Sequence, residues 1–350
     1  MNSKLTFKNL ILTLVICGAL CGLNNIGQAA EAARPETRST AAETRNGYYY
    51  TIQKGDTLWD LSRRFSTTPW VWPELWEENS ETIANPHLIY PGQKIRLTRI
   101  AGGRPADISA KAAAEPLVTG IHYYFSLSDQ YGFIRKVPVT PEGIIFKSQD
   151  AGKQMISEGD ILYIRPDRNT SLSLGQRLTI YRTFKPITDQ KTQELIGTQH
   201  LLCGVLEIVQ REPQYAVAKV TESYRPIGIG DLVMPYQRRS PYIEIKNSQP
   251  GIDGKLIVAE EHLSIFAESH VAFINQGRRH GVQPGQIYSI YQADEHHFSS
   301  ASSAQPITIP IYFGELLVLH TEEDTSTVVI TDSKKESREG TRIRTPLALR

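Results

Sequence analysis

Cysteine is scarce in this sequence, with 3 residues among 350. Cys17 and Cys21 lie in an apolar N-terminal stretch, which leaves Cys203 as the one cysteine of the remaining chain. A single cysteine cannot form a disulfide within the chain, so the fold must be stabilised by burial of apolar side chains. The hydrophobic content of 40% is enough for more than one core.

An excess of charge of one sign is also absent, since the chain has 38 basic and 37 acidic residues. This balance gives no electrostatic basis for binding nucleic acid or an anionic membrane surface. The one long apolar run, residues 10–23, is shorter than the roughly 20 residues that a membrane-spanning helix needs. We therefore expect no nucleic acid partner, and no transmembrane span after this run is removed.

The N-terminal segment has the order of a secretory signal peptide. Two lysines precede the apolar run, and small residues follow it. We expect a signal peptide over residues 1–29, cleaved after Ala29 or Ala32, and a protein exported to the periplasm or the cell wall. Lipidation of one of the two N-terminal cysteines is the alternative, although neither follows the small residue that lipoprotein processing requires.

Two polar segments without apolar periodicity divide the rest of the chain. Residues 30–47 and 101–116 are predicted to be flexible linkers. The segment between them, residues 48–100, is predicted to be a small folded domain. From residue 117 onward, short alternating strands are separated by Gly, Pro, Asp and Asn, which is typical of an all-β region.

The all-β region repeats itself at a spacing of 110 residues. Residues 174–182 (LGQRLTIYR) align with 284–292 (PGQIYSIYQ), and the same shift aligns Gly204 with Gly314. A gapless match of glycine spacings indicates a duplicated unit. The alternative is two unrelated strand-rich stretches that share turn glycines.

We therefore predict two tandem β domains, barrel- or sandwich-like, over residues 117–240 and 250–345, with a linker at 241–249. Each resembles the C-terminal β domain of the flagellar assembly protein T family, which implies a role in envelope assembly contacts and no catalytic residue. The resemblance rests on residues 175–181, 285–291, 204–206, 314–316, Ser223, Gly230 and Asp231. The second domain departs from it at Thr341, which replaces the aspartate.

The small domain opens with a strand that runs directly into a helix. Residues 48–53 alternate as a strand, and Gly55 supplies the backbone conformation that ends it. Asp56 or Thr57 is expected to cap the helix that follows. The buried face of that helix is expected to comprise Leu58, Leu61 and Phe65, with Trp59 beside them in the core.

A second short helix over residues 73–79 and a closing strand over 94–98 complete the order strand, helix, helix, strand. The motifs GDTLWDLS (55–62), LWEEN ending at Asn79 and IYPGQKIRL (89–97) resemble those of the LysM (lysin motif) domain. This resemblance implies a βααβ fold, with two helices on one face of a two-stranded antiparallel sheet. It also implies binding to glycans that contain N-acetylglucosamine, such as peptidoglycan or chitin.

In the LysM family the sugar lies in a shallow groove between the loop after the first strand and the loop before the second. The residues that this resemblance assigns to the groove are Gly55, Asp56, Thr57, Leu58, Leu88, Ile89 and Tyr90. A neutral acetamido sugar needs backbone donors and acceptors and an apolar wall, which such loops can provide. No cofactor or metal is expected.

Three tryptophans, Trp70, Trp72 and Trp76, lie between and within the two helices, where most family members have a shorter and less aromatic link. They could extend the sugar groove as a stacking surface, or they could form a larger core under the longer loop. Aromatic clusters in small domains usually belong to the core, so the second interpretation is favoured.

No familiar catalytic arrangement occurs in the β region. Cys203 lies near His200, but the 110-residue shift aligns them with Phe313 and Pro310, which favours a structural cysteine over a nucleophile. The cluster DEHHF at residues 294–298 opens a Ser-rich stretch, which favours a solvated loop over a zinc site.

The sequence therefore favours a non-catalytic envelope protein. Its LysM-like domain is expected to bind the glycan strands of peptidoglycan, and its two β domains are expected to contact other envelope proteins. The alternative is a peptidoglycan-remodelling hydrolase with a site in the β region that uses Cys203, or His296 and His297.

Overall fold

The computed structural model describes residues 45–66, 68–97, 120–150, 153, 155–168, 170–296 and 307–346. The predicted signal peptide, nearly all of the linker at 30–47, the linker at 101–116, His297 and the side chain of His296 lie outside the described residues. No helix in these ranges is long and apolar enough to cross a membrane.

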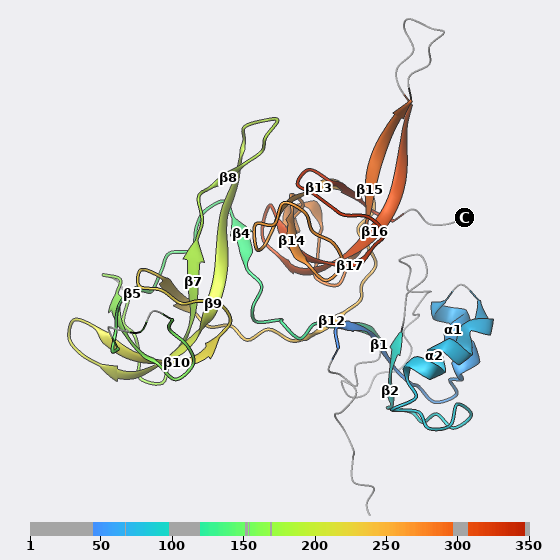
Figure 1. Cartoon of the computed structure of the whole chain (residues 1–350), viewed down its shortest axis with the longest axis horizontal. Helices are drawn as coiled ribbons and strands as arrows, with labels where there is room; N and C mark the ends of the chain where they lie inside the picture. The colour runs from blue at the N-terminus through green and yellow to red at the C-terminus, as the bar shows by residue number, and fades with distance from the viewer. Residues whose placement is uncertain are drawn as a thin grey trace, which may run out of the picture. The chain divides into compact units, whose positions relative to one another are not determined.

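The small domain has the predicted order of strand, helix, helix and strand (Figure 1). Its elements are β1 (Gly47–Thr51), α1 (Leu58–Phe65), a 3-10 turn η1 (Pro69–Val71), α2 (Trp72–Glu78) and β2 (Lys94–Leu97). Thr57 caps α1, because its hydroxyl oxygen accepts a hydrogen bond from the Asp60 amide at 3.1 Å. The expected apolar face of α1, with Leu58, Leu61 and Phe65, is buried.

The sheet of the small domain has four strands, where the LysM resemblance implied two. Its order is β12–β3–β1–β2, and all neighbours are antiparallel. β3 (Ile121–Tyr124) follows the linker expected at 101–116, and β12 (Tyr242–Glu244) lies inside the segment expected to be the linker 241–249. β3 pairs with the backbone groups along the free edge of β1, which would otherwise be open to other chains.

The first part of the all-β region closes into a ring of strands, which we call barrel 1. Pairing runs β5–β6–β10–β9–β7–β11 and returns from β11 to β5. The strands are β5 (Gly143–Ser148), β6 (Ile161–Pro166), β7 (Arg177–Thr183), β9 (Leu195–Arg211), β10 (Ala216–Ser223) and β11 (Leu232–Pro235). β4 (Phe133–Arg135) and β8 (Ile187–Thr188) pair with β9 beside this ring.

The second part forms a closed barrel of the same design, barrel 2, in the order β13–β14–β17–β16–β15–β18. Its strands are β13 (Asp253–Ala259), β14 (Val271–Ile274), β15 (Ile287–His296), β16 (Ile307–Thr321), β17 (Ser326–Ser333) and β18 (Arg342–Arg344), with a 3-10 turn η3 (Arg278–His280). β15 and β16 run side by side as a long hairpin (Figure 1).

The two barrels share strand register as well as strand order. Ile180 pairs with Gly204 in barrel 1, and the residues 110 positions later, Ile290 and Gly314, pair in barrel 2. A β-bulge follows both pairs at the same place. The sequence repeat is therefore a repeat of structure, and the predicted fold class, a small α+β domain followed by all-β barrels, is confirmed.

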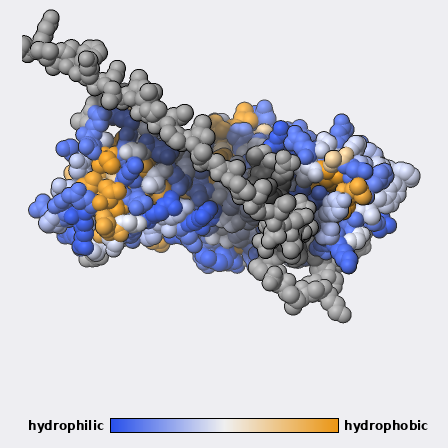
Figure 2. Space-filling view, turned by 90° about the horizontal axis from the view of Figure 1, so that it is seen from below, coloured by the Kyte–Doolittle hydropathy of each residue, from blue (hydrophilic) through white to orange (hydrophobic). Residues whose placement is uncertain are grey.

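Each barrel has its own buried apolar core. The core of the small domain continues further, since Tyr48 and Tyr123 belong to one buried cluster with Leu317 and Leu319 of barrel 2. The surface is mixed: on the face in Figure 2, hydrophobic residues form small patches separated by hydrophilic ones. The small domain is thus built from its own strands together with segments that follow in the chain.

Candidate functional site

The first of the two predicted groove loops is a tight turn after β1. Gly55 has φ of 97°, a left-handed conformation that favours glycine. The Asp56 carboxylate closes the turn, because its Oδ2 accepts hydrogen bonds from the Gln53 amide at 2.7 Å and the Tyr50 hydroxyl at 2.9 Å. Asp56 therefore shapes the loop through its side chain.

The second loop is tied to the first through Ile52, the residue directly after β1. The Ile52 amide donates to the Gln93 carbonyl, and the Gly92 amide donates to the Ile52 carbonyl, both at 2.8 Å. The Gln93 side chain accepts a hydrogen bond from the Tyr90 amide at 2.8 Å. These bonds hold residues 88–93 beside the turn at residues 53–57.

The predicted groove residues differ in what they present to solvent. Leu88 and Tyr90 are exposed, by 54% and 58%, whereas Ile89 packs partly against the core. The Leu58 side chain is buried, so this residue can offer only its backbone. The amides of Leu58 and Trp59 belong to the first turn of α1, where an amide has no acceptor within the helix. The two loops thus combine free donors with exposed apolar side chains.

Comparison with known proteins identifies the small domain. The LysM domain family matches residues 50–98. These residues form a LysM domain. The chain is also 39% identical over 57 residues to the uncharacterized protein YqbP of Bacillus subtilis (strain 168), a match of 14% of this chain and 26% of YqbP. It is 29% identical over 84 residues to the potassium binding protein Kbp of Escherichia coli O6:H1 (strain CFT073), a match of 24% of this chain and 51% of Kbp.

The chain covers about a quarter of the length of YqbP and half of the length of Kbp. The predicted LysM resemblance is therefore confirmed for residues 50–98. A LysM domain is a binding module for peptidoglycan and related glycans. The resemblance of the two barrels to the flagellar assembly family stays a prediction.

The tryptophans of the LysM domain differ in part from the sequence expectation. Trp72 and Trp76 pack against the core, and the Trp76 indole donates to the Ile83 carbonyl at 2.9 Å. Trp70, in contrast, is 74% exposed. The prediction that Trp59 lies in the core is wrong, since Trp59 is 37% exposed. In a helix Trp59 points about 100° away from Leu58, which puts it off the buried face.

Trp59 and Trp70 contact each other, with ring centroids 4.8 Å apart and planes at 84°. Trp59 and Trp70 lie on separate elements, α1 and η1, so no local spacing in the sequence predicts this pair. The helical spacing puts Trp59 off the face formed by Leu58, Leu61 and Phe65. This spacing already indicates, from the sequence, that Trp59 is exposed.

Cys203 and His200, which lie close together in the sequence, have separate environments in barrel 1. Cys203 is fully buried in the core of barrel 1, and burial raises the pKa of its thiol to about 11. His200 stacks on Phe133 with ring centroids 4.6 Å apart, and burial lowers its pKa to about 4. Its Nε2 accepts a hydrogen bond from the Val139 amide at 3.0 Å. Neither side chain has the exposure that attack on a polymer requires.

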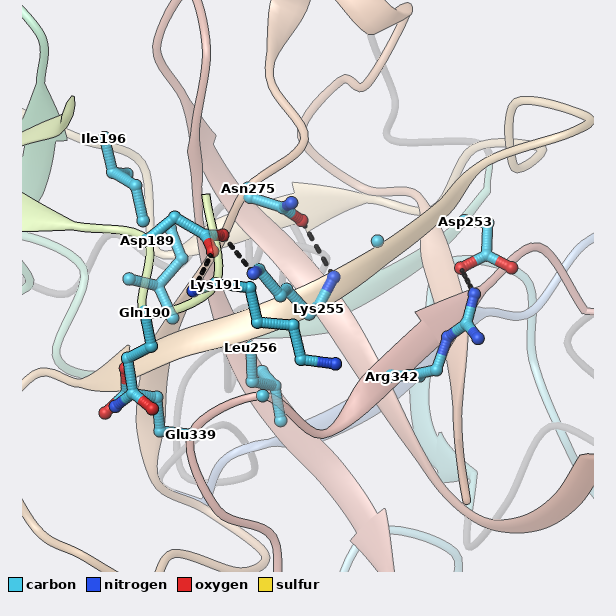
Figure 3. Close-up of a pocket in the computed structure, with 13 residues that line it drawn as sticks. Asp189, Gln190, Lys191, Ile196, Asp253, Lys255, Leu256, Asn275, Glu339 and Arg342 are labelled. Atoms are coloured by element: carbon cyan, nitrogen blue, oxygen red, sulfur yellow. Dashed lines mark hydrogen bonds and ion pairs between the residues drawn. The ribbon is translucent and has the colours of Figure 1, made fainter. Parts of the chain in front are cut away.

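A cavity of about 390 Å³ lies between residues of the two barrels (Figure 3). Lys255 forms an ion pair with Asp189 there, and Arg342 forms one with Asp253 at 2.9 Å. Asn275 accepts a hydrogen bond from the Lys255 amide at 2.8 Å. The charges and hydrogen-bonding groups of these residues are thus paired within the cavity. None of the residues that line the cavity belongs to the LysM loops. Among the described residues, no group of three or more His, Cys, Asp or Glu side chains could hold a metal ion.

Proposed function

We propose that this protein is a non-catalytic component of the cell envelope that binds peptidoglycan through its LysM domain. In this proposal the chain is exported, and the two barrels, over residues 117–240 and 250–345, contact other envelope proteins. The observation that carries the proposal is the arrangement of the turn at residues 53–57 beside the loop at residues 88–93, within a matched LysM domain.

The chemistry of these loops suits a neutral acetamido sugar. The first-turn amides of α1 can donate to the acetamido carbonyl, and the exposed side chains of Leu88 and Tyr90 can cover the apolar face of the sugar ring. The proposed contacts are therefore the backbone of Gly55, Asp56, Thr57 and Leu58 with Leu88, Ile89 and Tyr90. One such shallow site binds weakly, but a polymer offers many copies of the ligand at high local concentration.

The barrels are proposed to act through their surfaces. The buried Cys203 supports this proposal against a cysteine hydrolase, because a thiol with a raised pKa is a poor nucleophile. The resemblance of both barrels to an envelope assembly domain supports protein contacts. Release of muropeptides from sacculi by the purified chain would instead favour the hydrolase.

The test is cosedimentation of the purified chain with peptidoglycan sacculi. A variant with Leu88→Ala and Tyr90→Ala should bind about tenfold more weakly, because it loses apolar contact area at the groove. Leu174→Ala is the matched control, since Leu174 is 72% exposed and lies in barrel 1. Point variants are preferable to deletion of the domain, because deletion would also expose the edge of β3. Equal binding by all three proteins would contradict the proposal.

A further inference from the structure

Trp59 and Trp70 form an exposed pair of aromatic rings in the LysM domain, outside the two loops of the proposed groove. Trp70 is 74% exposed and Trp59 is 37% exposed, and each ring makes contact with the other. Large aromatic side chains bury most of their area in a typical domain, and their exposure marks binding surfaces. The pair therefore needs an explanation beyond core packing.

The backbone of Trp70 lies in the short 3-10 turn η1. The hydroxyl of Thr68 accepts a hydrogen bond from the Trp70 amide at 3.4 Å, and Pro69 begins the 3-10 turn η1. Trp72, which begins α2 directly after that turn, packs partly against the domain core. The ring of Trp70 is thus presented on a structured segment, and removal of so exposed a ring should leave the core intact.

The pair adjoins the groove through Trp59. This residue directly follows Leu58, so their Cα atoms lie about 3.8 Å apart across one peptide bond, and it shares the first turn of α1 with the free amides. The Trp70 ring contacts the Trp59 ring, with centroids 4.8 Å apart. Of the charged residues that follow Trp59 in α1, Asp60 and Arg63 are paired with each other at 2.7 Å, so these two charges offset one another. Two exposed indole rings that contact each other suit the apolar face of a sugar ring, which an aromatic side chain can stack against.

We infer that Trp59 and Trp70 form a second sugar contact, which stacks on a ring of the glycan next to the one held between the two loops. The inference rests on the proposed function and extends it. The ligand it assigns is a neutral oligosaccharide of N-acetylglucosamine units that is long enough to occupy both places. A disaccharide fills only the groove between the two loops, so its binding affinity does not depend on Trp59 and Trp70.

The test compares chitobiose with chitohexaose by calorimetric titration of the purified chain. Trp70→Ala should weaken chitohexaose binding about tenfold and leave chitobiose binding unchanged. Trp70→Phe should retain most of the affinity for chitohexaose, because it keeps an aromatic face. Leu174→Ala, a change at an equally exposed residue in barrel 1, is the control and should bind both sugars as the original chain does. The sugar-induced change in tryptophan fluorescence should shrink in Trp70→Ala with chitohexaose alone.

Unchanged chitohexaose affinity in Trp70→Ala, with normal binding by the original chain, would overturn this inference and leave the proposed function standing. Failure of the original chain to bind either sugar would overturn both. Binding to phosphatidylcholine vesicles that Trp70→Ala abolishes, with sugar affinities unchanged, would assign the pair to lipid instead. A dimer that dissociates on the same change would assign it to a second copy of the chain.

Discussion

Asp231 marks a difference between the two barrels that is confined to a few side chains. Its buried carboxylate accepts hydrogen bonds from Arg182, with Nε at 2.7 Å and Nη2 at 2.9 Å, and from the Gly228 amide at 2.8 Å. In barrel 2 the equivalent of Asp231 is Thr341, whose hydroxyl accepts from the Arg338 amide at 3.0 Å. Gln292 occupies the place of Arg182. Barrel 2 thus keeps the turn hydrogen bond without the ion pair.

This difference predicts the outcome of exchanging the residues. Arg182→Gln alone should destabilise barrel 1 by about 2 kcal/mol, because it leaves a buried carboxylate without its cation. Adding Asp231→Thr should recover most of the lost stability, since barrel 2 has glutamine and threonine at the two equivalent positions, Gln292 and Thr341. The buried thiol of Cys203 provides the measurement: its rate of labelling by a thiol reagent reports opening of barrel 1. A double variant that labels as fast as Arg182→Gln would contradict the prediction.

Glu260 has a carboxyl group that burial keeps partly protonated near neutral pH. Burial raises its pKa from 4.5 to about 7, against the opposing effects of Arg225, 3.2 Å away, and of a hydrogen bond from the Gly132 amide. Of the other nearby charges, Glu261 raises this pKa and Arg239 lowers it. The folded chain therefore binds this proton more tightly than the unfolded chain does.

Because the pKa of Glu260 is raised on folding, its contribution to stability is full below about pH 4.5 and is lost as the pH rises through about 7. Between about pH 5 and pH 8 the original chain should lose about 2–3 kcal/mol through this group. Glu260→Gln should remove that part of the pH dependence. The measurement is the difference in unfolding free energy between the two proteins across this range. A constant difference would show that Glu260 does not titrate there.

At the scale of elements, β3 is the main addition to the LysM fold. Tyr123 of β3 is buried and packs edge to face on Tyr48 of β1, with ring centroids 5.0 Å apart. Tyr123→Ala should destabilise this sheet by about 3 kcal/mol through the cavity that it leaves. Hydrogen exchange should then be faster at the β1 amides and unchanged in barrel 1. Tyr90→Ala, a change at an exposed tyrosine, is the control. Unaltered protection of β1 in Tyr123→Ala would show that β3 is not needed.

The local pattern was sufficient to predict the LysM elements and the spacing of the two barrels. The turn at Gly55, the cap at Thr57 and the buried face of α1 each depend on neighbouring residues. The pairing of Tyr48 with Tyr123 joins residues far apart in the chain, and no local periodicity encodes it. β12 spans only Tyr242–Glu244, and although Ile243 and Ile245 alternate with Glu244, so short a run does not predict its pairing with β3. The groove residues themselves came from the resemblance, since shallow loops have no pattern of their own.

At the scale of the whole molecule, the chain combines one glycan-binding module with two barrels that repeat one design. Ion pairs join the barrels, among them Arg135 with Glu322 at 2.8 Å and Arg225 with Glu260. Buried apolar residues of the LysM sheet and barrel 2 belong to one cluster. We therefore expect the barrels to remain folded and in contact when the LysM domain binds glycan, and binding to be localised in the two loops.

Hydrogen exchange of the purified chain with and without chitohexaose shows directly whether the LysM domain binds glycan between its two loops. Bound chitohexaose should slow exchange in the segments that contain residues 55–59 and 88–90, with little change in either barrel. Protection confined to the barrels, or the absence of any protection at saturating sugar, would contradict a glycan site between these loops.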